Sequence, residues 1–136
     1  MLLGCKGQFV HKIVEGTKPH SFRANRKDGR KWKVGDTIQF YENVRQPDMR
    51  KIRPDAVVKG VQDVKMILRI NKSIDQYNFY LFIDRKNRKG FARHQIMEKD
   101  GFEEVIQFIR FFFPKEKFNK SGTWEGQLVH WTDLKY

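Results

Sequence analysis

The apolar residues of this chain fall into short runs whose spacing changes between the period of a helix and that of a strand. Helical spacing predicts two helices, over residues 9–14 and 102–113. Alternating apolar and polar residues, or β-branched and aromatic residues close together, predict strands at 20–23, 36–43, 57–70, 78–84 and 126–132. Several strands with only two or three helices are not enough for a doubly wound sheet. The pattern predicts a small α+β fold or a partly open barrel.

Glycine, proline and capping residues mark the ends of these elements. Gly16 stands where a left-handed glycine closes the first helix, and Pro114 closes the second. The segment Asp100-Gly101-Phe102-Glu103 has the form of a capping box, which predicts Asp100 as the N-cap of the second helix. Pro19 disfavours helical geometry before it, so a strand is expected to leave from residue 20. Residues 24–35, 44–55 and 85–90 are predicted to be basic loops or turns.

The length and the single cysteine exclude several classes of protein. A chain of 136 residues without repeats or long linkers suits one domain, over residues 1–136. Cys5 has no partner for a disulfide within the chain. No apolar run approaches the roughly 20 residues that a bilayer requires, and residues 1–5 are too short for the apolar core of a signal peptide. We therefore expect a soluble, cytoplasmic protein that does not bind a membrane.

The positive charge is concentrated in the loops. The chain has 28 Lys and Arg against 16 Asp and Glu, a formal charge of +12, which favours an anionic partner. Eleven of these cations lie between Lys18 and Arg53, where only four acidic residues oppose them, and a second group lies at residues 85–89. Such clusters bind phosphates through counterion release. Trp32 and Tyr41 lie among these charges and could stack on unpaired bases, although the alternative is a solubilising surface with Trp32 covering one end of the barrel.

One motif resembles a known family. Residues 16–23 read Gly-Thr-Lys-Pro-His-Ser-Phe-Arg, which is similar to the Gly-x-Lys-x-x-Glu-x-Arg signature of the activating-signal-cointegrator homology (ASCH) domain of the PUA-like superfamily. Gly16, Lys18 and Arg23 match this signature, and Ser21 replaces its Glu. Val34-Gly35-Asp36 resembles the turn that precedes the next strand of the family.

A bacterial and phage branch of the same superfamily is similar over more of the chain. The segments that correspond are His20-Ser21-Phe22-Arg23, Trp32-Lys33, Asp100-Gly101-Phe102 and His130-Trp131-Thr132-Asp133. The resemblance extends over about residues 9–133. It implies a PUA-like, partly open β-barrel flanked by two or three helices, with RNA or a nucleoside-like ligand as the partner.

The basic loops and the motif together give the candidate residues for nucleic-acid binding. These are Lys18, Arg23, Arg26, Lys27, Arg30, Lys31, Trp32, Lys33, Arg45 and Arg50. Arg23 suits a ligand anchor, because guanidinium groups bind phosphate in a bidentate manner. The alternative for Arg23 is a salt bridge to Asp36 or Glu98.

The same motif suggests an enzyme as the alternative function. A crowded lysine has a lowered pKa and can act as a base, and a neighbouring hydroxyl can then be the nucleophile. The motif resembles that of small amidohydrolases that deacetylate acetylated cytidine with a Lys, a Thr three residues later and a more distant Glu. Lys18, Ser21 and Glu98 occupy these places and are the candidate catalytic residues; a ribonuclease at the same site is also open. Since residues 18 and 21 of a regular strand face opposite sides, the pair needs a bend, as at Pro19.

The remaining candidates favour structural roles. His11, His20, His94 and His130 lack the spacing of metal ligands, so we expect no metal site and no cofactor. The aromatic run at 108–113 is explained mostly by core packing. Any part left exposed would form a partner surface, giving a monomer or a weak dimer through this helix.

Overall fold

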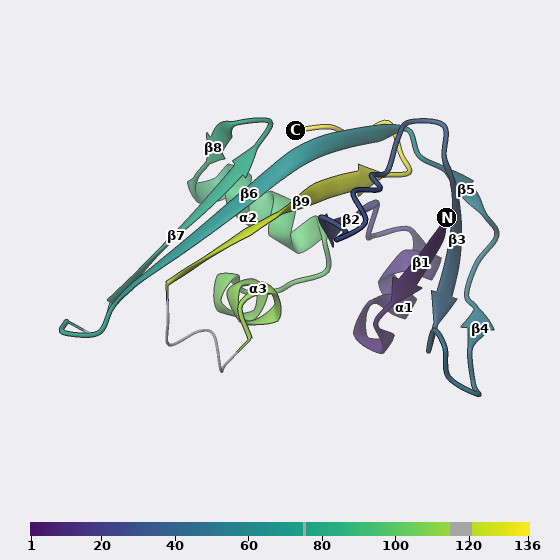
Figure 1. Ribbon diagram of the computed structural model, residues 1–136, viewed down its shortest axis with the longest axis horizontal. Helices are drawn as coiled ribbons and strands as arrows, with labels where there is room; N and C mark the ends of the chain where they lie inside the picture. The colour runs from purple at the N-terminus through teal and green to yellow at the C-terminus, as the bar shows by residue number, and fades with distance from the viewer. Residues whose placement is uncertain (75, 115–120) are drawn as a thin grey trace.

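Two sheets and three helices make up the described part of the chain, which comprises residues 1–74, 76–114 and 121–136 of a computed structural model (Figure 1). The α+β class expected from the sequence is confirmed. The two sheets are not closed into a barrel within these residues.

The larger sheet is antiparallel throughout and has the strand order β2-β9-β6-β7-β8. Its strands are β2 (His20–Ala24), β6 (Gly60–Asn71), β7 (Gln76–Ile83), β8 (Lys86–Arg88) and β9 (Gly122–His130). Alternation along β6 buries Val64, Met66 and Leu68 on one face, whereas Asp63 and Lys65 are exposed on the other. This period of two gives the sheet one covered and one open face.

The smaller sheet is built around β3 (Thr37–Glu42), whose Ile38 and Phe40 are fully buried. β1 (Leu2–Cys5) pairs with β3 in parallel, and the short strands β4 (Arg50–Lys51) and β5 (Ala56–Val57) pair with it in antiparallel orientation. The predicted loop over 44–55 therefore contains a two-residue strand.

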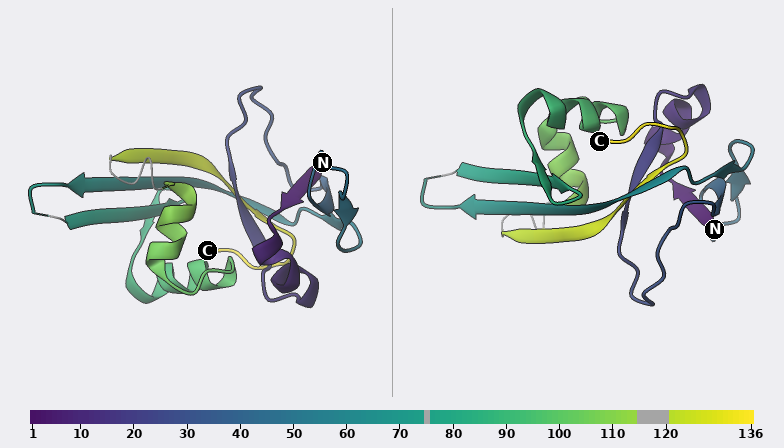
Figure 2. Two further views of the ribbon diagram at one scale, coloured as in Figure 1. Left: turned by 90° about the horizontal axis from the view of Figure 1, so that it is seen from below. Right: turned by 90° about the horizontal axis from the view of Figure 1, so that it is seen from above.

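Two helices cover one face of the larger sheet. α2 (Gly90–Lys99) and α3 (Val105–Phe112) lie on the same side of it, while α1 (Gly7–Glu15) lies beside β1 (Figures 1 and 2). Phe108 of α3 is fully buried and makes edge-to-face contacts with Phe22 of β2 and Phe79 of β7. Of the phenylalanines at 108–113, only Phe111 is exposed, at 37% of its surface. Most of the aromatic run is therefore core.

The first helix and the predicted strands are confirmed with small shifts at their ends. Gly16 closes α1 in the left-handed conformation, with φ 88°, and its N–H donates to the Ile13 carbonyl. Other elements differ from the prediction: residues 86–88 form β8 rather than a turn, residues 56–57 form the separate short strand β5, β4 lies within a predicted loop, and neither β1 nor α2 was predicted.

The predicted capping box at Asp100 is wrong. Asp100 follows the last residue of α2. The N-cap of α3 is Glu104, four residues later, with Gln107 in the capping box. The Gln107 side-chain oxygen accepts hydrogen bonds from the backbone N–H groups of Glu103 and Glu104. Among the described residues, no helix is both long enough and apolar enough to cross a bilayer.

Candidate functional site

A small cavity lies where α1, β1, β2 and α3 meet. Its volume is about 200 Å³. It is lined by Gly4, Cys5, Lys6, Phe9, Ile13, Lys18, Ser21, Phe22, Arg23, Asp100, Phe111 and Phe112. We call it the Lys18 cavity. It brings together three residues predicted from the sequence motif, Lys18, Ser21 and Arg23.

Lys18 is buried and held by one acidic residue. Its ammonium group donates to the Asp100 carboxylate at 2.6 Å and to the Asp100 carbonyl at 2.8 Å, and it lies 4.8 Å from the centre of the Phe9 ring. Burial lowers the pKa of Lys18, and the Asp100 carboxylate opposes this effect. Since an isolated charge is costly in an apolar interior, the two groups depend on each other.

The turn after α2 places Asp100 at this position. Gly101 has a φ of 101°, and a Cβ at this residue would lie 2.8 Å from the Phe9 ring. A glycine is therefore required both by the backbone and by the close approach of α1. The turn directs the Asp100 side chain back toward Lys18, although the two residues are 82 positions apart.

Asp100 also contacts a buried histidine. His20 Nδ1 lies 3.1 Å from the Asp100 carboxylate, and His20 Nε2 lies 2.7 Å from the Tyr136 hydroxyl. Burial lowers the pKa of His20, so the neutral ring is favoured. With the proton on Nδ1, the ring donates to Asp100 and accepts from Tyr136. Asp100 therefore links Lys18 in the cavity to His20 and Tyr136, which do not line it.

A second histidine lies against the first. The rings of His20 and His130 are 5.2 Å apart, and His130 Nε2 lies 2.9 Å from the side-chain oxygen of Gln62. Burial lowers the pKa of His130 to about 4. The Gln62 amide donates to Asp84, which connects this buried network to the β7–β8 turn.

Arg23 crosses from β2 to β1. Its guanidinium donates to the Gly4 carbonyl at 2.7 Å, whereas its Nε is buried and has no hydrogen-bond partner among the residues that the structure describes. It forms no ion pair there with Asp36 or Glu98. The salt-bridge alternative for Arg23 is thus wrong within this part of the chain.

The predicted acid Glu98 does not line the Lys18 cavity. Its side chain is 69% exposed and lies 3.4 Å from His94 on the same helix. The carboxylate beside Lys18 is that of Asp100, two residues further along. The local offset from Phe102 suggested Glu98, whereas the fold of the turn after α2 brings in Asp100. Lys18 precedes β2, so the expected bend near Pro19 allows Lys18 and Ser21 to line one cavity.

The basic loops converge on a second site beside β1. Arg26 and Arg30 from the first loop and Arg45 from the second line a groove of about 450 Å³. Its other lining residues are Met1, Leu2, Val44 and Met49. We call this the arginine groove. None of the described residues that line it is acidic, although Arg26 also contacts Asp28 at 3.0 Å.

The other predicted binding residues do not gather at one place. Lys27 and Lys33 are exposed, and Arg50 pairs with Glu42 at 2.7 Å. Trp32 is buried, and its backbone N–H and carbonyl both bond to the Gln127 side chain. The prediction that Trp32 stacks on bases is therefore wrong, because its ring belongs to the core.

Across 1–74, 76–114 and 121–136, no group of three or more His, Cys, Asp or Glu side chains could hold a metal ion. No motif in the sequence marks Tyr136. Asp100 was predicted as the N-cap of the second helix, whereas it is the C-cap residue of α2.

The comparisons with known proteins gave no match: no family model, no curated protein and no solved structure is similar to this chain. Function is therefore inferred from the chain's own residues.

Proposed function

We propose that this chain is an RNA-binding protein of ASCH/PUA-like fold that holds phosphate groups in the arginine groove. The observation that carries the proposal is the convergence of Arg26, Arg30 and Arg45, from two separate loops, on an apolar floor without an acidic lining residue. Guanidinium groups match the geometry of phosphate oxygens and remain charged at any physiological pH.

The Lys18 cavity offers a second contact for the same ligand. Leu2 of β1 lines the arginine groove, and Gly4 and Cys5 of the same strand line the cavity. Aromatic rings and the Lys18 and Arg23 cations suit a small planar group that carries hydrogen-bond acceptors, such as a nucleobase. At about 200 Å³, the cavity is below the usual range for drug-sized ligands, which limits it to one such group.

The test is titration of single-stranded and structured RNA at several salt concentrations. We expect the triple variant Arg26→Ala/Arg30→Ala/Arg45→Ala to weaken binding and to reduce the slope of log K against log salt by roughly 2, about 0.7 for each lost phosphate contact. The control, Lys72→Ala/Lys99→Ala/Lys135→Ala, removes the same charge at exposed positions outside both basic groups. Absence of binding by the wild type near 50 mM salt, or a flat salt dependence, would contradict the proposal.

An amidohydrolase acting on acetylated cytidine is the second candidate, because Lys18 and Ser21 line one cavity. In this reading a neutral Lys18 takes the proton from the Ser21 hydroxyl as its oxygen attacks the acetyl carbonyl. The C–N bond then breaks, the cytidine amine leaves with the proton held on Lys18, and water hydrolyses the acetyl ester on Ser21 to release acetate. Asp100 takes the place proposed for Glu98. The test compares turnover by the wild type, Lys18→Ala and Ser21→Ala. Equal rates would exclude these roles; cleavage of RNA instead would indicate a ribonuclease.

A further inference from the structure

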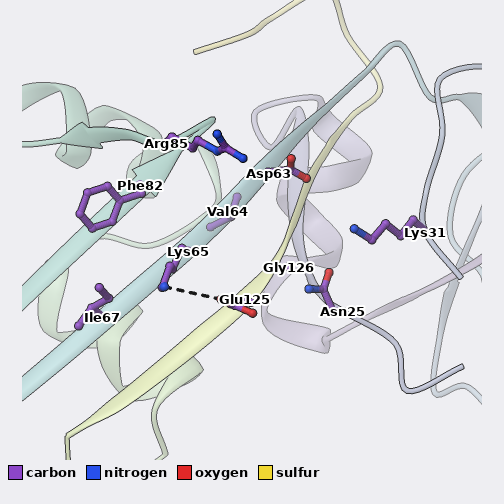
Figure 3. Close-up of a pocket in the computed structure, with 10 residues that line it drawn as sticks. All are labelled: Asn25, Lys31, Asp63, Val64, Lys65, Ile67, Phe82, Arg85, Glu125 and Gly126. Carbon is purple, nitrogen blue, oxygen red and sulfur yellow. Dashed lines mark ion pairs between the residues drawn. The ribbon is translucent and has the colours of Figure 1, made fainter. Parts of the chain in front are cut away.

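The open face of the larger sheet carries a groove that joins two cations from the predicted basic segments, Lys31 and Arg85, with sheet residues that no motif predicted. It has a volume of about 450 Å³ and crosses β7, β6 and β9 to reach the loop after β2 (Figure 3). Its lining residues are Asn25, Lys31, Asp63, Val64, Lys65, Ile67, Phe82, Arg85, Glu125 and Gly126. We call it the sheet groove. Its residues Asp63 and Lys65 belong to the exposed face of β6, away from the buried Met66 and Leu68. The loop that carries Lys31 lies on the side of the sheet opposite α2 and α3 (Figure 2).

Two cations stand at opposite ends of the sheet groove, with apolar residues between them. Arg85 lies at the β7 end and Lys31 at the end near the loop, and Phe82 and Ile67 form part of the floor (Figure 3). Among the described residues, neither Arg85 nor Lys31 forms an ion pair, whereas Lys65 lies 3.8 Å from Glu125. Two positive charges are therefore available to a ligand.

The turn that carries Arg85 has an unfavourable backbone. Asp84 and Arg85 have φ angles of 50° and 68°, in the left-handed region that glycine or asparagine usually occupies in such hairpins. Asp84 holds the turn, because its carboxylate accepts hydrogen bonds from the Asp63 N–H at 3.0 Å and from the Gln62 amide at 2.9 Å. Residues other than glycine that adopt left-handed backbone angles are often found at functional sites. Here the strained turn places the Arg85 cation over the sheet.

The acidic residues restrict what the sheet groove accepts. The Asp63 carboxylate lies between the two cations, and Glu125 lies on β9 opposite Lys65, with which it pairs (Figure 3). A continuous row of phosphates along the floor would be repelled by them. A ligand that fits has anionic groups at the ends and a planar group with hydrogen-bond donors in the middle.

We propose that the sheet groove binds an unpaired segment of single-stranded RNA. A base stacks on the Phe82 ring, phosphates contact Arg85 and Lys31, and Asp63 accepts a hydrogen bond from a ribose 2′-hydroxyl or a base amino group. This inference rests on the proposed RNA-binding function and names the form of RNA. The loop at 25–36 connects the two sites, since Arg26 and Arg30 line the arginine groove and Lys31 lines the sheet groove.

The experiment measures the affinity of the full chain for a short single-stranded oligouridine, the DNA of the same length and an RNA duplex. Phe82→Leu keeps an apolar side chain but removes the stacking ring, and we expect it to weaken single-strand binding about tenfold. Phe91→Leu is the matched control, because Phe91 is exposed on α2, on the other side of the sheet. Asp63→Asn is expected to reduce the preference for RNA over DNA severalfold.

Arg85→Gly separates binding from folding. Glycine suits the backbone at this residue, so the urea midpoint is expected to stay equal or to rise while the affinity for oligouridine falls. A structural role for Arg85 predicts the reverse. The sheet groove proposal is overturned if Phe82→Leu and Arg85→Gly bind like the wild type.

The outcomes also separate the two proposals. If only the triple variant of the arginine groove loses affinity, RNA binding stands and the sheet groove is excluded as its site. If the wild type binds no RNA at 50 mM salt, both proposals fail. Binding of poly-glutamate in place of RNA, with the same loss in Phe82→Leu, would assign the sheet groove to an acidic protein and overturn the inference.

Discussion

Two buried histidines determine much of the chemistry at the centre of the molecule. His20 and His130 are both fully buried, and each has hydrogen-bond partners that suit a neutral ring. The Nδ1 of His130 has no hydrogen-bond partner among the described residues. A proton added there would place a buried charge with no hydrogen-bond partner against the ring of His20, so the folded state resists protonation.

The first prediction is a loss of stability in mild acid. The pKa of His130 is about 4 in the folded protein against 6.5 for a free side chain, and the pKa of His20 is lowered as well. Because the folded pKa is depressed, the unfolded chain binds more protons below pH 6.5. The contribution of these histidines to the free energy of unfolding is therefore fully present above pH 6.5. It decreases as the pH falls toward 4, with a limiting slope of about 1.4 kcal/mol per pH unit for each histidine.

Urea unfolding between pH 7.5 and 5 measures this effect while most carboxylates stay ionised. His130→Gln should flatten the pH profile, whatever its effect on stability at pH 7.5. His11→Gln is the control at an exposed position and should leave the profile as it is. An unchanged profile in His130→Gln would show that this histidine is not the titrating group.

The second prediction concerns the connection between α2 and α3. Gly101 has a positive φ, and its Cα faces the Phe9 ring of α1. Gly101→Ala should therefore lower the free energy of unfolding by about 1–3 kcal/mol, through backbone strain and the displaced ring. Gly7→Ala is the matched control. At Gly7, in the first turn of α1, a Cβ meets nothing within 4 Å, and alanine should be neutral or stabilising. Equal stabilities of the two variants in urea would contradict this account.

The sequence predicts elements whose pattern is local. The apolar residues of α1 recur at the helical period and those of the strands at a period of two. Gly16 marks the end of α1, as the structure confirms. α2 has no such pattern: of its ten residues, only Ile96 and Met97 are buried, so no apolar stripe appears. The capping pattern occurs twice, at residues 100–103 and at residues 104–107. Phe102 is buried in the core ahead of α3, and the second pattern caps the helix.

The candidate site follows the same rule. Lys18, Ser21 and Arg23 belong to one short motif, and all three line the Lys18 cavity. The acidic partner of Lys18, Asp100, comes from a turn 82 residues further along the chain. The offset from Phe102 in the sequence favoured Glu98 instead. The exposed face of β6 and β7 was overlooked because Phe82 and Arg85 form a site only after strand pairing places them beside residues of β9.

The charge of the whole molecule acts on folding and on binding in opposite directions. A net charge of +12 on 136 residues gives mutual repulsion in the compact state, and most of the cations are exposed. The exposed ion pairs, such as Lys51–Asp55 and Arg26–Asp28, contribute little stability in water. Repulsion among unpaired cations therefore outweighs attraction at the surface.

The third prediction follows from this balance. Raising the salt concentration from 50 to 500 mM screens the repulsion, since the Debye length falls from about 14 to about 4 Å, and the free energy of unfolding should rise. Over the same range, RNA affinity should fall through the loss of counterion release. The triple arginine variant has fewer repelling charges, so its stability should depend less on salt. Urea unfolding and RNA titration in the same buffers measure the two effects. If the free energy of unfolding falls as salt is added, attractive ion pairs dominate the surface. The convergence of Arg26, Arg30 and Arg45 would then not destabilise the folded protein by repulsion, and an anion bound there would have no such repulsion to relieve.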